Sequence, residues 1–474
     1  MSENNFDGNI FLLTADSLQW KAFNNRLDEI ASLTNGTIFE ESVSTAPFTV
    51  SAMPSLAAGV YGDTVGIGLP EASKPTTLAE ALSRAEFTNI LISDNYLFGA
   101  EYNYQRGFDM GDLGEPTTKK KIANILQNSP VPGVFEVSEW IYFNIIKRMG
   151  ANNETFYRSA STLHETAKGY LSDIPQEDNV FCWIHYMDTH HPFEPPQEYL
   201  DSRTLNQSKS RSDWASYTRD AIQNGGQNLS ESEIADIREV YDACCEYLFD
   251  ELRNFITYLI DSGRYSPDED LLVFTADHGE SLSPVEHGIM GHTPAMYWED
   301  VVRVPLLVSH PEWDSTRTDG QVSLIDLMPT ILDLVGAPVP DSVEGTAAKA
   351  PSDLVRDHAF FTGIDPIGPI KSAESVAVSR GIRTNSGKKV FGDYERVSGS
   401  PVVSTEFDET EETVLFTGDE GGLIADSETA GEMLKELKEM RGNPTENIDV
   451  ADLMSDSAAQ EEIQEHLEDL GYLE

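Results

Sequence analysis

An apolar segment that ends abruptly in polar residues constrains the fold more than any other part of the chain. Residues 271–276 (Leu-Leu-Val-Phe-Thr-Ala) are apolar or small, and Asp277, His278 and Gly279 follow at once. Such a run predicts a strand buried on both faces of a helix-covered sheet, and open α/β sheets place their sites at the carboxyl ends of these strands. On its own, Asp-His-Gly fits a metal site and an ordinary strand-end turn equally, because Asp caps helices and His is often a surface residue.

A second apolar segment, near the N-terminus, also ends on an acidic residue. Residues 10–14 read Ile-Phe-Leu-Leu-Thr, and Asp16 and Ser17 follow after one alanine. The carboxyl ends of parallel strands meet at one edge of a sheet, so we expect Asp16 and Asp277 to lie close together. Two carboxylates delivered in this way can bracket a divalent cation.

Residues 45–62 supply the candidate nucleophile. This stretch is rich in small residues and hydroxyls, which predicts a loop that enters a helix whose N-terminal amides can bind an anion. Thr49 is one of its candidate hydroxyls. Ser51 and Ser55 are its rivals, although Ser55 would lie at least one turn inside the helix. Alternatively, Thr49 simply caps this helix.

Alternating strand and helix patterns predict an α/β fold. With 474 residues, the chain is too long for one core and suits a large α/β domain with a smaller partner. Strands are expected at 10–14, 90–93, 180–187, 271–275 and 304–309, and helices at 18–32, 77–85, 232–262 and 325–335. This order is typical of a large, mostly parallel sheet flanked by helices on both faces.

A segment rich in Pro, Ala, Asp and Ser, residues 337–357, is the expected domain boundary. It separates a catalytic domain, 1–345, from a smaller C-terminal α+β subdomain, 346–474. The subdomain is expected to carry a short antiparallel sheet, and its candidate strands are 359–363, 376–384 and 389–394. An acidic, helix-rich end is expected to follow them.

The charge balance indicates adaptation to high salt. The chain has 81 acidic and 32 basic residues, a formal net charge of −49, yet 39% of its residues are hydrophobic. The acids are spread over segments that keep strand and helix patterns, which argues against a disordered acidic tail. A carboxylate-covered surface stays soluble in molar salt, where screening removes most self-repulsion. We therefore expect a protein of a salt-accumulating, archaeal halophile, with no nucleic-acid partner.

Two further features bear on location and redox state. No stretch approaches the length of a transmembrane helix, and the first residues lack the basic start of a secretory signal, so a cytoplasmic protein is expected. Cys182, Cys244 and Cys245 cannot form a disulfide framework and have no metal-finger spacing. We interpret them as buried small apolar residues.

Taken in order along the chain, these motifs resemble the sulfatase branch of the alkaline phosphatase superfamily. Thr14-Ala-Asp16-Ser-Leu is similar to the family's first metal strand, and Pro47-Phe-Thr49 through Gly59-Val-Tyr61 is similar to its nucleophile helix. The later matching segments are 185–193 (a histidine segment), 241–251 (a helix), 275–292 and 303–307 (the second metal strand and its downstream loop), 323–336, 443–447 and 470–473.

The resemblance implies one divalent metal ion, and mixed oxygen and nitrogen ligands leave Mn, Zn, Mg and Ca all open. Asp16, Asp277 and His278 would hold this ion, and the hydroxyl of Thr49 would sit on it. Coordination lowers the pKa of a hydroxyl group, which makes a poor nucleophile usable near neutral pH.

Histidines are the other candidates for catalysis that the resemblance implies. His190 and His292 would bind the non-bridging oxygens of the ester or protonate the leaving group. Asp188 is expected to orient His190 rather than to bind metal, and His191 is expected to be a solvated neighbour. His287 either orients another ligand or is an ordinary surface residue.

Departures from the family pattern narrow the set of reactions that the resemblance implies. Authentic sulfatases carry a Cys or Ser that is converted to formylglycine, in a Cys/Ser-x-Pro-x-Arg frame, where this chain has Thr49-Val-Ser51-Ala-Met53. Threonine cannot form that aldehyde. A sulfate group on an ordinary alcohol leaves slowly, whereas a phosphoryl group on threonine can be displaced. The chain therefore looks more like the family's phosphoglycerol and phosphoethanolamine transferases or phosphatases. Pro192 stands where two-metal relatives have a histidine, which favours one metal.

The predicted function is a metal-dependent hydrolase or transferase that cleaves a phosphate or sulfate ester through a covalent threonine intermediate. Its substrate would be an anionic ester, such as that of a polar glycan or glycerol compound. One alternative is a sulfate-ester hydrolase that works without formylglycine. Another is a degenerate protein that only binds an anionic ligand, because Met53 replaces the arginine and Ser17 replaces a second acid.

Overall fold

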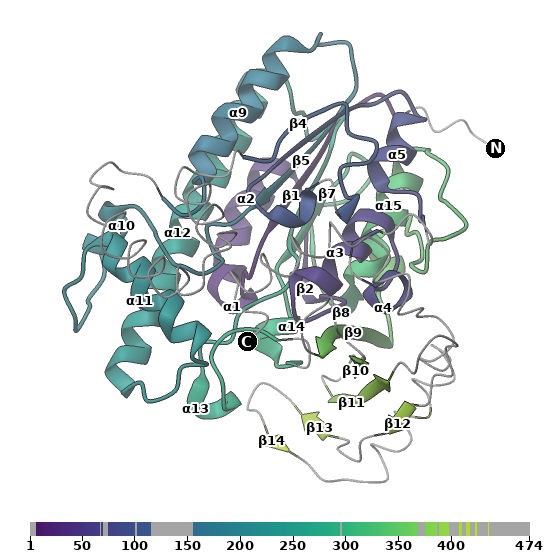
Figure 1. The fold of residues 1–474 in the computed structure, drawn as a ribbon. Coiled ribbons are helices and arrows are strands. Elements are labelled where there is room, and N and C mark those ends of the chain that lie inside the picture. Colours follow the sequence, from purple (N-terminus) through teal and green to yellow (C-terminus); the bar gives the residue numbers. More distant parts are fainter. Residues whose placement is uncertain are drawn as a thin grey trace, which may run out of the picture.

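An eight-stranded mixed sheet forms the centre of the protein (Figure 1), with strand order β4-β3-β5-β1-β6-β7-β2-β8. The strands are β1 (Ile10–Ala15), β2 (Thr37–Val43), β3 (Thr88–Ser93), β4 (Met110–Asp112), β5 (Val180–Tyr186), β6 (Leu271–Ala276), β7 (Leu306–Ser309) and β8 (Arg317–Ser323). Only β7 runs antiparallel to its neighbours, β6 and β2. This arrangement confirms the expected α/β fold with a large, mostly parallel sheet.

The computed structural model describes most of the chain. The described residues are 6–66, 68–69, 74–99, 102–114, 155–293, 296–367, 375–385, 388–397, 407–409, 414–417, 422–423 and 435. Among them, no helix is both long and apolar enough to cross a membrane. A basic run, Lys119-Lys120-Lys121, and most of the acidic end lie outside the described residues, as do the family-like segments 443–447 and 470–473.

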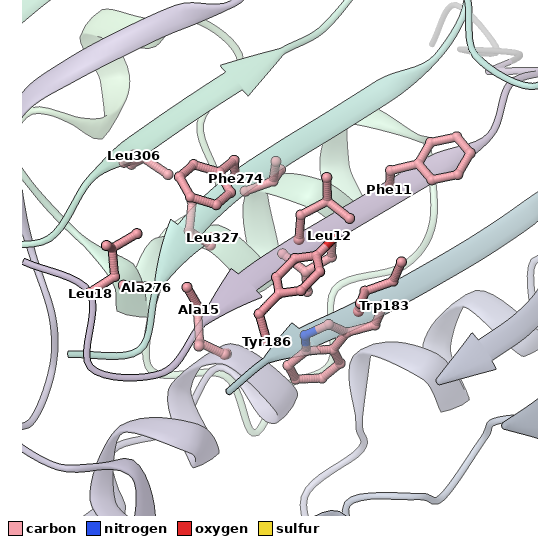
Figure 2. Packing of buried hydrophobic residues seen from close by; sticks show 14 of the residues in the cluster. Phe11, Leu12, Ala15, Leu18, Trp183, Tyr186, Phe274, Ala276, Leu306 and Leu327 are labelled. Carbon is pink, nitrogen blue, oxygen red and sulfur yellow. The ribbon is translucent and has the colours of Figure 1, made fainter. Parts of the chain in front are cut away.

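The three central strands are buried along their whole length, as their apolar sequences predict. All residues of β1, β5 and β6 are buried, and β1 pairs in parallel with both of its neighbours. Figure 2 shows Phe11 and Leu12 of β1 beside Trp183 and Tyr186 of β5. The register aligns the last residue of β1, Ala15, with Ala276 of β6 and with Tyr186 of β5, so these three strands deliver the residues that follow them to one edge of the sheet.

Helices cover both faces of the sheet (Figure 1). On one side lie α1 (Trp20–Phe23), α2 (Leu27–Thr34), α9 (Ala160–Asp173) and α12 (Glu231–Asp261), and on the other α3 (Thr49–Ala58), α5 (Leu78–Ser83) and α15 (Leu327–Leu334). Helix α12 begins with a capping box, in which Ser230 and Glu233 satisfy each other's backbone amides. Its apolar stripe packs against the sheet and includes Cys244 and Cys245, which are free and buried, as is Cys182.

A second sheet follows the main one in sequence. It contains β9 (His358–Ile367), β10 (Ser375–Thr384), β11 (Lys388–Val397), β12 (Phe407–Glu409), β13 (Val414–Thr417) and β14 (Gly422–Leu423), and every pairing is antiparallel. The first three strands confirm those expected from the sequence. The division at residue 345/346 stays a prediction.

Buried polar contacts join the second sheet to the main sheet. Arg380 of β10 forms a fully buried ion pair with Asp63, and Nε of Arg383 donates to Glu299 at 3.0 Å. Backbone amides of β9 donate to the segment before and within α3: Thr362 N to Thr45 O at 2.8 Å, and Ile364 N to Ser51 Oγ at 3.2 Å. The second sheet therefore directly supports the start of α3.

Candidate active site

Asp16 and Asp277 lie side by side at the carboxyl edge of the sheet. Each follows the last residue of a central strand, and each is completely buried. Ser17, which adopts a left-handed backbone conformation with φ of 59°, links them. Its hydroxyl donates to Asp16 Oδ1 at 2.9 Å, and its amide donates to Asp277 Oδ1 at 3.3 Å. The expected convergence of the two acids is confirmed in position.

Thr49 is the first residue of α3 and reaches the same point. Its Oγ1 lies 3.3 Å from Asp16 Oδ2 and 3.1 Å from Nε2 of His278. The structure thus brings together Asp16, Thr49, Asp277 and His278. The helix cap is Phe48, with no side-chain cap bond, so the hydroxyl of Thr49 does not cap α3.

The rival hydroxyls of α3 have other partners. Ser51 Oγ accepts the amide of Ile364, and Ser55 Oγ donates to Ala52 O at 2.6 Å while bonding to the hydroxyl of Thr45 at 2.7 Å. Both side chains are buried and hold α3 against its surroundings. Of the three candidates, Thr49 is the one that faces the acids.

The tautomer of His278 can be read from its hydrogen bonds. Its Nδ1 lies 2.7 Å from the carbonyl oxygen of Gly279. A carbonyl oxygen only accepts, so Nδ1 carries the proton and Nε2 presents a lone pair toward Thr49. Burial holds the pKa of His278 below its ordinary value, against the opposing effect of Asp16, so the ring is neutral at pH 7. This is the state in which histidine binds a metal or accepts a proton.

Two residues near Asp16 were not predicted as site residues. Asn95, which follows β3, donates its side-chain amide to Asp16 Oδ2 at 2.9 Å. His185, within β5, places Nε2 at 3.5 Å from the same oxygen, and its carboxylate neighbours make it a candidate metal ligand with Asp16 and Asp277. A detectable signal for His185 was its polar character inside an otherwise apolar strand.

A second group of polar residues lies next to the first. His191, Glu280 and His292 are all buried, and His292 Nδ1 lies 3.1 Å from Glu280 Oε1. The ring of His292 also lies against that of His278, with centroids 4.4 Å apart and the ring planes tilted by 46°. The prediction that His191 is solvated is therefore wrong: its Nδ1 faces Glu280 Oε2 at 3.8 Å.

The expected pairing of Asp188 with His190 is also wrong. Asp188 Oδ1 accepts the backbone amide of Ala160 at 3.1 Å, which is the first residue of α9, so Asp188 serves that helix terminus. His190 instead bonds through Nδ1 to the carbonyl oxygen of His191. Its Nε2 is therefore the acceptor nitrogen of the neutral ring. Burial lowers the pKa of His190 to about 3.

His287 lies outside both groups. Its Nδ1 bonds to the hydroxyl of Ser281 at 2.7 Å, and its ring stacks on Trp298 with centroids 4.3 Å apart. These contacts anchor the loop around α13 (Pro284–His287). Support of this loop is a role that neither interpretation of His287 from the sequence had named.

The electrostatics of the acid pair fit a bound cation. Burial and the neighbouring charge of Asp16 raise the pKa of Asp277 to about 8. For Asp16, burial alone would raise the pKa, but His190, His185 and His278 outweigh it and hold the pKa well below the usual range. In addition, Asp277 Oδ2 is buried with no hydrogen-bond partner among the described residues. A buried carboxylate oxygen of this kind is either protonated or bound to a cation, and the donors around it would suit a divalent ion.

Comparison with known proteins places the chain among enzymes that share this arrangement of strands. A family model described as Sulfatase matches residues 8–337, which is more than half of the 474 residues. The chain belongs to the sulfatase family. The matched range contains both groups of site residues.

Curated relatives from this family match parts of the chain. The uncharacterized sulfatase YidJ of Escherichia coli K12 is 26% identical over 260 residues, which cover 49% of each chain. The multifunctional alkaline phosphatase superfamily protein PehA of Trinickia caryophylli is 32% identical over 125 residues, 25% of this chain and 23% of PehA. Arylsulfatase K of Bos taurus is 29% identical over 155 residues, 32% of this chain and 27% of its own. The chain thus matches about half or less of the length of these relatives.

Solved structures share the fold over nearly the whole chain. The phosphonate monoester hydrolase of Agrobacterium radiobacter superposes with a TM-score of 0.62 at 17% identity, covering 92% of this chain and 96% of its own. The putative sulfatase YidJ of Bacteroides fragilis gives a TM-score of 0.62 at 14% identity, covering 95% and 99%. At such identities the likeness concerns the fold alone.

Within the sulfatase family, this chain departs from the family pattern at two positions of the candidate site. Met53, in the position where the family pattern has arginine, is completely buried in α3. Ser17, in the position of a second acid, donates a hydrogen bond to Asp16 and does not add a carboxylate. Both departures read from the sequence are therefore present in the folded site.

Proposed function

We propose that this protein is a divalent-metal-dependent hydrolase or transferase of an anionic phosphate or sulfate ester, with Thr49 as its nucleophile. The observation that carries the proposal is the position of the Thr49 hydroxyl, 3.1 Å from the unprotonated Nε2 of His278 and 3.3 Å from a carboxylate oxygen of Asp16. A buried hydroxyl on a helix terminus needs no such neighbours for stability. They are the neighbours that activate a weak nucleophile.

Asp16, Asp277, His278 and Thr49 are the residues we propose as holders of one divalent ion, with His185 as a further candidate ligand. When bound, the ion would lower the pKa of the threonine hydroxyl and offset the charge of the ester. Ser17 and Asn95 donate hydrogen bonds to Asp16 and fix the orientation of its carboxylate. Nε2 of His278 carries the lone pair that would bind the ion, so the proton of the Thr49 hydroxyl would go to Asp16 Oδ2, which accepts its hydrogen bond at 3.3 Å.

The first turn of α3 also contributes to substrate binding in this proposal. The leading amides of a helix have no partner inside the helix, and its dipole favours negative charge at this end. α3 spans ten residues and starts at Thr49 itself, so an ester group in line with this hydroxyl meets these amides. They take over part of the role of the missing arginine.

His190 and His292 complete the proposed mechanism in different roles. His190 presents an acceptor nitrogen, so it can accept a hydrogen bond from an attacking water or alcohol and orient it in the second step. The ring of His292 lies beside Glu280 and His278, and we assign it to the ester or leaving-group oxygen. This division refines the equal roles first expected for the two rings.

Phosphoryl transfer is the reaction class that we favour over sulfate hydrolysis. A phosphoryl group on the Thr49 oxygen can be displaced by an activated acceptor, whereas a sulfate ester of an ordinary alcohol resists cleavage. The relatives named as sulfatases and as an alkaline phosphatase superfamily protein are consistent with either ester. A glycan or glycerol-linked phosphate is the substrate class proposed.

Turnover and adduct mass test this proposal together. Aryl phosphate, aryl phosphodiester and aryl sulfate are offered to the protein in molar KCl, with and without added Mn²⁺ or Zn²⁺. We expect metal-dependent release from a phosphate ester and, with a slow substrate, a phosphoryl mass added to the peptide that carries Thr49. A sulfate mass there would instead support the alternative sulfate-ester hydrolase.

Two variants at position 49 distinguish a nucleophilic role of Thr49 from a purely structural one. Thr49→Ser keeps the hydroxyl and should retain turnover and the adduct, while the isosteric Thr49→Val should lower kcat by at least about a hundredfold, since the covalent route is lost. Full metal-dependent turnover by Thr49→Val would refute the nucleophile. Metal and anion binding by wild type without any turnover would support the degenerate binding protein that Met53 and Ser17 leave open.

A further inference from the structure

We propose that the protein binds a second divalent cation between His191, Glu280 and His292. The chemistry of these three ligands suits Zn²⁺. This inference rests on the proposed function, because the second ion would complete the same site. It corrects the expectation of a single metal, which relied on Pro192 replacing one histidine of the two-metal pattern.

The spacing of the three side chains fits one ion. A ligand atom from each lies within 4.8 Å of the other two, and all three residues are buried. His292 Nδ1 is 3.1 and 3.2 Å from the two oxygens of Glu280, and His191 Nδ1 is 3.8 Å from one of them. Zinc bonds of about 2.0–2.2 Å place neighbouring tetrahedral ligands roughly 3.4 Å apart. The observed separations bracket that value.

The backbone holds two of the ligands rigidly. Ser281 and Gly291 form an antiparallel bridge, with hydrogen bonds of 3.2 and 2.8 Å, so the adjacent residues Glu280 and His292 are brought together. The amide of Glu280 also donates to Asp300 O at 3.1 Å. Two imidazoles and one carboxylate with an open fourth position form a ligand set that catalytic zinc commonly has.

The charge of the whole site favours a second divalent cation once all three carboxylates are ionised. Asp16, Asp277 and Glu280 are three completely buried carboxylates, and their ion pairs among the described residues involve only histidines. Histidines that bind metal are neutral. One divalent cation would leave a net negative charge facing an anionic ester, whereas two cations give a net positive charge that attracts it.

The alternative is that no metal binds there and Glu280 only accepts hydrogen bonds from the two imidazoles and orients them. Equilibrium metal stoichiometry separates the two cases without relying on activity. The full chain is freed of metal, equilibrated with buffered Zn²⁺ in molar KCl to suppress loose binding to the acidic surface, and its zinc content is measured. We expect two tightly bound ions per chain in wild type.

Three variants assign the ions. Glu280→Gln keeps an acceptor for the imidazoles but removes the charge, and should retain one ion. His287→Gln, outside both groups, should retain two. Asp277→Asn should lose the ion of the Thr49 site, which tests the proposed function separately. If Glu280→Gln does not fold, as judged by near-ultraviolet circular dichroism, His191→Gln replaces it with the same expected count.

The result that overturns the second site is a single ion in wild type, or two ions in both wild type and Glu280→Gln. In either case the proposed function stands as long as Asp277→Asn loses an ion. Conversely, if Asp277→Asn keeps the wild-type count while Glu280→Gln loses one ion, the second site stands and the proposed Thr49 metal site fails.

Discussion

Thr49 Oγ1 lies 3.1 Å from Nε2 of His278, the ring nitrogen that carries no proton. The two side chains come from segments more than two hundred residues apart in sequence, and both are buried. The hydrogen bond of His278 Nδ1 to the carbonyl oxygen of Gly279 fixes this tautomer. In the proposed function, this geometry would let His278 and the threonine hydroxyl share one divalent ion, which would activate the hydroxyl.

Placing at position 17 the acid of the family pattern should tighten metal binding and lower the free energy of unfolding of the metal-free protein. In Ser17→Asp, the new carboxylate replaces a hydroxyl that donates to Asp16 at 2.9 Å, so metal-free stability should fall by roughly 1–3 kcal/mol. Aspartate tolerates the left-handed backbone of this position, and the added charge should lower the metal Kd by about tenfold. Calorimetric metal titration and thermal melts measure both effects.

Ser17→Ala is the matched control for this prediction, because it removes the same hydrogen bond without adding charge. It should also lower the free energy of unfolding of the metal-free protein, but the metal affinity should be no tighter than in wild type. Equal metal affinities of the aspartate and alanine variants would contradict a cation beside Asp16.

Gly279 should be intolerant of any side chain. A Cβ at this position would lie 2.1 Å from the carbonyl oxygen of Asp300 and 3.3 Å from Val301 Cα, because the chain after β6 runs directly against that segment. Gly279→Ala should therefore cost on the order of 3 kcal/mol or more of unfolding free energy. Urea denaturation in molar KCl measures it.

Gly169, in the middle of α9, offers the comparison. A Cβ there has no neighbour within 4 Å, so Gly169→Ala should stabilise the protein by about 0.5–1 kcal/mol through helix propensity. Similar changes in unfolding free energy for Gly279→Ala and Gly169→Ala would contradict the close approach of the backbone at Gly279.

His164 should make the protein acid-sensitive. Its ring is buried, stacks on Phe255 with centroids 4.3 Å apart, and bonds through Nε2 to Tyr186 Oη at 2.8 Å. Burial lowers its pKa, only partly opposed by Glu251. His164 therefore binds a proton more readily in the unfolded chain than in the folded protein. The contribution of the neutral ring to the free energy of unfolding is present above about pH 6.5 and is lost as pH falls below it.

His164→Gln should remove this part of the pH dependence. The difference in unfolding free energy between wild type and variant should shrink as pH falls below about 6.5, by at most about 1.4 kcal/mol per pH unit for one proton. Urea titrations at several pH values in molar KCl give this difference directly. A difference that stays constant from pH 8 to pH 5 would mean that His164 does not titrate on unfolding.

The net charge of −49 should make folding dependent on salt. At about 0.01 M salt the screening length is roughly 30 Å and self-repulsion acts across the whole protein, while at about 1 M it falls to roughly 3 Å. We expect loss of the near-ultraviolet circular dichroism signal on dilution from molar KCl, and recovery with NaCl at equal ionic strength. Full stability in dilute buffer would contradict salt adaptation.

The sequence predicted the parts of the site that strand geometry determines. Asp16 and Asp277 end two apolar strands, and parallel pairing alone brings them together. A stretch rich in small residues and hydroxyls predicted the start of a helix near Thr49, but the choice of Thr49 itself came from the resemblance to the sulfatase family. The convergence of the two acids needed only local pattern and the general rule that strand ends share an edge.

Residues placed by long-range contacts could not be predicted in the same way. The partners of Asp188 and His191 are Ala160 and Glu280, and no periodicity reveals such pairings. Strand β8 was missed for a related reason, since it begins with Arg-Thr-Asp-Gly at the edge of the sheet and is only partly buried there.

The hydrogen bonds from β9 to Thr45 and Ser51 have a consequence for how this protein can be altered. Grafting the second sheet from another family member would not be a neutral exchange of a peripheral module. It would remove two of the anchors that hold the nucleophile helix at its present distance from the acids. Chimeras that preserve the backbone of residues 362–364 should therefore tolerate such an exchange best.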